Sequence, residues 1–120
     1  MSKILVVDDE PNMVDIIKIV LKNEGHEIIE AFSGSECIEK TKREKPDLII
    51  LDIRMPEMDG WTTLRKLKEM KLLKGTKVII VTVEKGPGVE IFGLQDLVAD
   101  YLTKPFDRKL LVEVVKETLK

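Results

Sequence analysis

Short runs of apolar residues alternate along the chain with longer segments in which apolar residues recur at helical spacing. A continuous apolar run predicts a strand that is covered on both faces, as in a parallel sheet. We expect five such strands, at residues 4–7, 26–31, 47–53, 78–83 and 100–103. The second is interrupted by Glu27 and Glu30, which is typical of a strand at the edge of a sheet.

The segments between these strands predict helices. We expect five, from Pro11 to Gly25, from Ser33 to about Lys45, from Asp59 to near Gly75, from Val89 to about Leu97 and from Arg108 to Lys120. The fourth contains Gly93 and follows Gly86-Pro87-Gly88, so we expect it to be short, displaced or mobile. Five alternations of strand and helix predict an α/β fold, in which a doubly wound parallel sheet carries helices on both faces.

The composition indicates one globular domain over residues 1–120, and we expect no second domain in this chain. Of its 120 residues, 43% are hydrophobic and 35% charged, as in folded rather than disordered chains. The formal charge of −2 argues against non-specific binding to nucleic acid or membranes. The single cysteine excludes an internal disulfide, no apolar run approaches about 18 residues, and the N-terminus leaves no room for a signal peptide. We therefore expect a cytoplasmic protein.

Three side chains are assigned structural roles. His26 lies at the start of a strand with no acidic or nucleophilic motif near it, so we expect it at the surface. Trp61 is expected to pack at the start of a helix. Cys37 belongs to a thin apolar face that it shares with Ile38 and Thr41.

Polar residues stand where the predicted strands end. Asp8 and Asp9 follow the first strand and Asp52 ends the third, while Thr82 and Lys104 stand at the ends of the fourth and fifth. The carboxyl ends of parallel strands form one binding edge of a doubly wound sheet. Three carboxylates meeting there would repel one another and raise each other's pKa unless a cation neutralised them. Oxygen ligands without His or Cys favour a hard divalent ion, and Mg²⁺ suits so few protein ligands.

The same residues are sufficient for phosphoryl transfer, which depends mainly on positioning and charge neutralisation. A carboxylate can act as the nucleophile, while a lysine and a threonine hydroxyl hold phosphoryl oxygens. Taken singly, each residue has an ordinary alternative. Asp52 is equally consistent with a solvated strand end, Thr82 with a common strand former, and Tyr101 with a half-buried packing residue.

Taken together, these residues resemble a response regulator receiver domain of two-component signalling, similar to chemotaxis regulators, over essentially the whole chain. The segments that carry the resemblance are Val6-Val7-Asp8-Asp9-Glu10-Pro11, Asp52 with Met55-Pro56-Glu57-Met58-Asp59-Gly60, Thr82, Tyr101, and Lys104-Pro105-Phe106. Their order and spacing make the resemblance specific. It implies a flavodoxin-like fold with the sheet order 2-1-3-4-5.

The resemblance also implies a metal site and a phosphoacceptor. It makes Asp52 the phosphoacceptor and a ligand of Mg²⁺. Asp9 would bind the ion through its side chain, Asp8 would act mainly through water, and Arg54 would contribute its backbone carbonyl.

A switch is implied by the same resemblance. Lys104 would contact the phosphoryl group and pair with Asp52 while that residue is unmodified. Thr82 would move inward to a phosphoryl oxygen, and Tyr101 would follow it. The bond between Lys104 and Pro105 would be cis, which is otherwise uncommon at about one in twenty X-Pro bonds.

The function implied is a phosphorylation-activated signalling switch. A sensor histidine kinase or phosphotransfer protein would donate the phosphoryl group. The signal would pass to an effector protein through the fourth helix, the fifth strand and the fifth helix, without direct contact to nucleic acid or membrane. The chain would be a monomer or a weak homodimer, and would catalyse only its own phosphorylation and dephosphorylation.

Two other functions were considered. A phosphohydrolase of the haloacid-dehalogenase type would carry an Asp-x-Asp motif after the first strand, whereas Asp8 and Asp9 are adjacent here. A receiver-like scaffold could bind partners without phosphorylation. The complete set of acids, threonine and lysine argues against the scaffold.

Several positions depart from the pattern of the family. Val83 replaces the very small residue that usually follows the switch threonine, so it could narrow access to the acceptor. Arg54 and Glu84 have opposite charges at two positions that tune phosphoryl lifetime, and could pair across the mouth of the site. Leu97 stands where the family often has glycine, which puts the partner surface formed by the fourth helix in doubt.

Overall fold

A five-stranded parallel sheet forms the centre of the protein in the computed structural model, which describes residues 2–83 and 94–120. Its order is β2-β1-β3-β4-β5, so the predicted strand order is confirmed. The strands are β1 Lys3–Val7, β2 Glu27–Ala31, β3 Leu48–Asp52, β4 Lys77–Thr82 and β5 Asp100–Thr103. Each lies within one or two residues of its predicted position.

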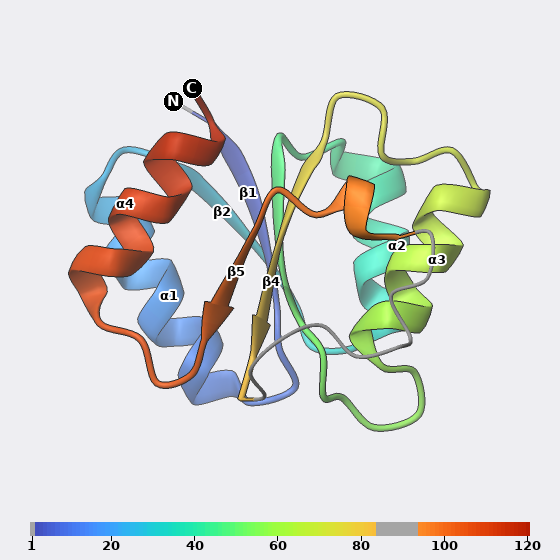
Figure 1. The fold of residues 1–120 in the computed structure, drawn as a ribbon, viewed down its shortest axis with the longest axis horizontal. Coiled ribbons are helices and arrows are strands. Elements are labelled where there is room, and N and C mark those ends of the chain that lie inside the picture. The colour runs from blue at the N-terminus through green and yellow to red at the C-terminus, as the bar shows by residue number, and fades with distance from the viewer. Residues whose placement is uncertain (1, 84–93) are drawn as a thin grey trace.

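Helices cover both faces of the sheet. Among the described residues they are α1 Pro11–Asn23, α2 Gly34–Glu44, α3 Gly60–Glu69 and α4 Arg108–Thr118, with a short 3-10 helix, η2, at Gln95–Leu97. Helices α1 and α4 lie on one face, and α2 and α3 on the other (Figure 1). The helix expected from Val89 falls largely on residues 84–93, outside the described residues. Its expected end forms η2 rather than an α-helix.

Alternation along the strands divides the apolar core into two layers. Ile4 and Val6 belong to the layer under α1 and α4, whereas Leu5 and Val7 belong to the layer under α2 and α3. All five residues of β3 are buried, because both layers cover this central strand. The packing therefore carries the strand that ends in Asp52 through the middle of the domain. No described helix is long and apolar enough to cross a lipid bilayer.

Helix α3 ends earlier than predicted, at Glu69 instead of near Gly75. The chain leaves the helix at Lys71, which has a φ of 58°, and Leu72 N–H donates to Leu67 O at 2.9 Å. This is the bonding of a Schellman ending, in which a left-handed residue closes the helix. The predicted end of α3 was wrong because Lys71, and not a glycine, takes the left-handed conformation that ends the helix.

Two helix ends should become more stable when glycine replaces lysine. Lys45, which closes α2 with a φ of 49°, and Lys71 both adopt the left-handed conformation. Lys45→Gly and Lys71→Gly are each expected to raise the free energy of unfolding by about 0.5 kcal/mol, because the left-handed conformation is strained for a residue with a Cβ atom. Urea denaturation at moderate salt measures this. Lys22→Gly, inside α1, should lower stability, and a loss at Lys45 or Lys71 would contradict the interpretation.

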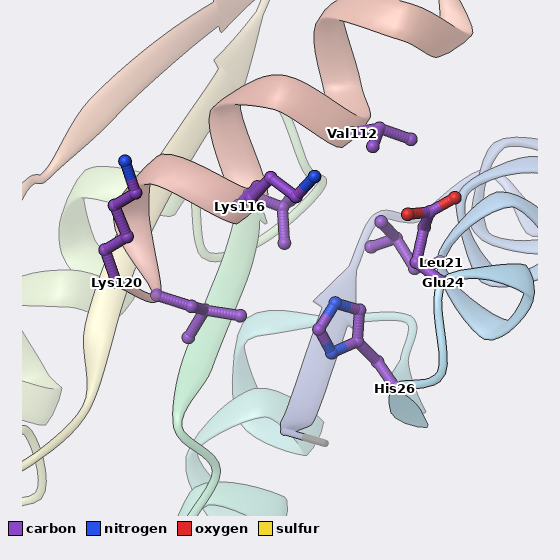
Figure 2. A pocket seen from close by; sticks show the side chains of 8 residues that line it. Leu21, Glu24, His26, Val112, Lys116 and Lys120 are labelled. Atoms are coloured by element: carbon purple, nitrogen blue, oxygen red, sulfur yellow. The ribbon is translucent and has the colours of Figure 1, made fainter.

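His26 is half-buried instead of lying at the open surface, so that prediction needs correction. It lines a cavity of about 200 Å³ between the end of α1 and helix α4, beside Lys116 (Figure 2). Its Nδ1 atom is enclosed without a hydrogen-bond partner among the described residues. Burial lowers the pKa of His26. Trp61 and Cys37 are both buried in the layer under α2 and α3, as predicted.

Candidate functional site

Three carboxylates meet at the carboxyl ends of two adjacent strands. Asp8 and Asp9 follow β1, and Asp52 is the last residue of β3, its neighbour in the sheet. One carboxylate oxygen from each of the three lies within 4.8 Å of the others. Asp8 is 2% exposed and Asp52 5% exposed. The convergence that the strand ends predict is therefore present.

Lys104 reaches this group from the end of β5. Its backbone N–H donates to Thr82 O at 2.8 Å, which holds the start of the following loop against β4. Its Nζ atom lies 3.7 Å from Asp52 Oδ1, as expected, and donates a shorter hydrogen bond of 2.9 Å to Asp8 Oδ2. The sequence reasoning missed this bond to Asp8. The bond between Lys104 and Pro105 is cis, which confirms that prediction.

The site carries more negative charge than its lysine neutralises. Burial raises the pKa of Asp52 to about 6, helped by the charge of Asp8 and opposed mainly by Lys104. Burial alone would lower the pKa of Lys104. The hydrogen bond to Asp8 and the charge of Asp52 have the opposite effect, and the net result is a raised lysine pKa. One ammonium thus faces three acidic groups.

The donor set fits a hard divalent cation. All three clustered side chains offer oxygen, with no His or Cys among them, and such sites favour Mg²⁺ or a similar ion. Both oxygens of Asp8 already accept hydrogen bonds, from Glu10 N–H at 3.0 Å and from Lys104. Asp9 is less buried than Asp8 and Asp52, and lies on the more accessible side of the cluster.

The start of α3 is pressed against the end of β3. Asp59 caps the helix by accepting a hydrogen bond from Thr62 N–H at 2.8 Å, and Gly60 N–H donates to Ile53 O at 2.8 Å. A Cβ atom at Gly60 would lie 2.8 Å from Ile53 Cα and closer still to Asp52 O. Only glycine therefore allows the start of α3 to lie this close to the end of β3, and this contact holds the backbone of Asp52 in place. The sequence indicated Gly60 as a helix start, without this contact.

Thr82 and Tyr101 lie on the same face of neighbouring strands. Tyr101 pairs with Ile80 in the register of β4 and β5, and Ile80 faces α2 and α3. Side chains two residues apart on a strand share a face, so Thr82 lies on that face as well. Thr82 is 8% exposed and Tyr101 is 37% exposed. Burial raises the pKa of the Tyr101 hydroxyl.

Three positions that depart from the pattern of the family are Val83, Glu84 and Leu97. Val83 follows Thr82, the last residue of β4, and is 53% exposed, so its expected effect on access to the acceptor stays a prediction. Glu84 lies outside the described residues, so its expected pairing with Arg54 stays a prediction. Leu97 is half-buried in η2 and packs against the core layer under α2 and α3.

Comparison with known proteins places these features in one family. Residues 4–116 match the family described as response regulator receiver domain. The chain is 36% identical over 119 residues to the alkaline phosphatase synthesis transcriptional regulatory protein PhoP of Bacillus subtilis. This match covers 99% of this chain and 49% of PhoP. The chain thus spans about half the length of PhoP. It is 32% identical over 119 residues to protein PilH of Pseudomonas aeruginosa, covering 99% of this chain and 98% of that protein.

A solved structure agrees with both sequence matches. The response regulator protein TrrA of Thermotoga maritima, in complex with Mg(2+)-BeF, superposes with a TM-score of 0.86 at 35% identity, covering 99% of this chain and 100% of that chain. That structure contains Mg(2+)-BeF, and the acidic cluster of this chain offers oxygen ligands that suit such an ion. The chain belongs to the response regulator receiver domain family of two-component signalling.

Proposed function

We propose that this domain is a Mg²⁺-dependent switch that accepts a phosphoryl group on Asp52. The observation that carries the proposal is the meeting of Asp8, Asp9 and Asp52 within 4.8 Å, with the ammonium of Lys104 hydrogen-bonded to the same group. A nucleophilic carboxylate, a cation site and a lysine supply what phosphoryl transfer requires.

The transfer joins an oxygen of Asp52 to phosphorus. The donor is a phosphohistidine of a sensor kinase or phosphotransfer protein, or a small acyl phosphate. As the new P–O bond forms, the donor's P–N or P–O bond breaks and the donor keeps that electron pair. Bound Mg²⁺, held by Asp8, Asp9, Asp52 and the Arg54 carbonyl, would neutralise charge there. Lys104 lies close enough to Asp52 to move from Asp8 to a phosphoryl oxygen.

The output of the switch would be a shift between two conformations. Thr82 would donate its hydroxyl to a phosphoryl oxygen, and Tyr101 would turn inward. A phosphoryl group shifts this equilibrium only if it binds the two conformations differently, and the bonds from Thr82 and Lys104 supply that difference. The exposure of Tyr101 supports this direction of movement. An effector protein would read the surface around β5 and α4.

Labelling distinguishes this proposal from the two alternatives. Incubation with acetyl phosphate and Mg²⁺ is expected to give a phosphoryl mass adduct that is absent in Asp52→Asn, without turnover of external phosphoesters. Repeated hydrolysis of such esters would indicate a phosphohydrolase instead. A wild-type protein that binds Mg²⁺ and is never labelled would indicate a scaffold.

Val83 should slow access to the acceptor. We expect Val83→Ala to speed labelling by acetyl phosphate about two- to tenfold, because the smaller side chain would widen access to the acceptor beside Thr82. Such a change corresponds to roughly 0.4–1.4 kcal/mol in the barrier. Rates come from a time course of intact mass. Val112→Ala, on α4, serves as the control, and equal rates for Val83→Ala and wild type would reject this role.

A further inference from the structure

Four lysines surround a cavity at the edge of the sheet opposite Asp52. Lys42 and Lys45 come from the end of α2, and Lys71 and Lys74 come from the connection between α3 and β4. The cavity has a volume of about 290 Å³. Both connections lie at the edge where the chain termini also lie, far from the carboxyl ends of the strands (Figure 1). This site is therefore separate from the acidic cluster.

The lining of this lysine cavity contains no acidic residue. Four lysines thus line one hollow in a chain whose net charge is −2. Two acids next to Lys45 and Pro46 in the sequence contact Lys3 instead of the cavity. Glu44 Oε1 lies 3.3 Å from Lys3 Nζ, and Asp47 Oδ2 accepts a hydrogen bond from Lys3 N–H at 2.9 Å. Within residues 2–83 and 94–120, no carboxylate lies within ion-pair distance of the four lysines.

The backbone beneath these lysines is held in place. Thr76 Oγ1 donates to Pro46 O at 2.7 Å and Lys77 N–H donates to Asp47 O at 3.0 Å, which ties the two connections together. The N–H groups of Lys45 and Lys71 are already bonded to carbonyls of their own helices. These bonds hold the two connections that carry the four lysines, whose ammonium groups are the charged donors of the lining.

Two of the four lysines occupy strained positions. Lys45 and Lys71 have φ angles of 49° and 58°, where glycine is the favoured residue. A helix C-terminus attracts cations, but α2 and α3 each already carry two basic residues in the last turn. Charge compensation at the helix ends therefore does not require lysine at these two positions.

We propose that the lysine cavity binds a small compound with several adjacent phosphate groups, either an inorganic polyphosphate or the phosphate chain of a nucleotide. Lysine binds phosphate as a point charge, without the planar geometry that arginine imposes. The volume is close to the lower end for small-molecule sites, roughly 300 Å³. Because the contacts are exposed ion pairs, binding should weaken as salt is raised.

Tripolyphosphate in Mg²⁺-free buffer is the probe that tests this proposal. Titration followed by ¹H–¹⁵N NMR is expected to shift the amide signals of residues 41–45 and 71–76, and to leave those around Asp52 unchanged. The double variant Lys45→Gly/Lys71→Gly should bind about tenfold more weakly, although it is expected to be more stable than wild type. Lost binding with raised stability cannot come from misfolding.

A matched control and two further ligands complete the test. Lys22→Gln/Lys109→Gln loses the same two charges elsewhere on the surface and should bind as wild type does. ATP that shifts the same signals would identify a nucleotide as a source, whereas tripolyphosphate alone would point to inorganic polyphosphate. Sodium sulfate at equal ionic strength should have little effect. Equal shifts with sulfate, or undiminished binding by the Lys45→Gly/Lys71→Gly variant, would overturn the proposal.

Discussion

Asp52→Asn is expected to raise the free energy of unfolding by about 2 kcal/mol at pH 8 in metal-free solution. The ionised carboxylate is buried beside Asp8, which raises its pKa from 3.8 to about 6. At about 1.4 kcal/mol per pH unit, that rise costs the folded state up to about 3 kcal/mol once Asp52 is ionised. Lys104 donates its 2.9 Å hydrogen bond to Asp8 and not to Asp52, so we expect that bond to remain in the variant. Urea denaturation followed by the fluorescence of the single tryptophan measures the difference.

The pH dependence of this gain has a defined sign. Between pH 4 and pH 6 the folded wild type binds more protons at Asp52 than the unfolded chain does, so its stability falls as pH rises through that range. The gain from Asp52→Asn should therefore shrink as pH is lowered from 6 to 4. Asp15→Asn, which removes an exposed carboxylate from α1, serves as the control. If Asp52→Asn were no more stable than wild type at pH 8, the inference that ionised Asp52 destabilises the folded protein would be contradicted.

Mg²⁺ should reduce the stability advantage of Asp52→Asn over wild type. A ligand that binds only the folded state at one hundred times its dissociation constant stabilises by about 2.7 kcal/mol. Wild type should gain this amount as the cation neutralises its clustered carboxylates, whereas Asp52→Asn lacks one of them and should gain less. Equal gains for the two proteins would place the ion elsewhere.

Gly60→Ala is expected to destabilise the protein by about 2–3 kcal/mol, the upper part of the range for overpacking, because the contacted backbone atoms cannot move away. The added Cβ would meet the backbone of Asp52 and Ile53, so α3 and the end of β3 must separate. The shift should also slow labelling of Asp52, since it displaces the acceptor. Denaturation midpoints and intact-mass time courses measure the two effects.

Gly34 provides the matched comparison for this substitution. A Cβ atom there would meet the side chains of Thr63 and Met58, with Met58 Sδ at 2.8 Å. A methionine side chain is flexible and can move aside, whereas the closer contact, Thr63 Oγ1, must shift together with its hydrogen bond to Asp59 O. Because both contacts are side chains and not backbone, Gly34→Ala should still cost less than Gly60→Ala. Equal losses at the two positions would show that contact with backbone is not the cause.

Most of the fold could be predicted because its determinants are local. The apolar run from Leu48 to Leu51 predicts a strand covered on both faces, and β3 is that strand. The end of α3 could not be predicted in the same way, since Lys71 takes a conformation that its residue type does not indicate. The cavity beside His26 depends on α4, some 90 residues later in the chain, and no pattern near His26 reveals it.

The candidate site was predictable to the extent that strand ends locate it. Asp8, Asp52 and Lys104 each end a strand or follow one, so a parallel sheet brings them to one edge. Which carboxylate Lys104 prefers depends on side-chain distances that the sequence does not contain. The close approach of Gly60 likewise depends on how α3 packs against β3, and the sequence indicated only a glycine near a helix start.

The intact mass of the protein after incubation with acetyl phosphate tests the central claim most directly, when measured in parallel with Mg²⁺ and in metal-free buffer. The proposal predicts one phosphoryl adduct on wild type with Mg²⁺, little adduct without it, and no adduct on Asp52→Asn under either condition. Equal labelling with and without Mg²⁺, or an adduct that persists in Asp52→Asn, would contradict the proposal that Asp52 is the phosphoacceptor of a magnesium-dependent switch.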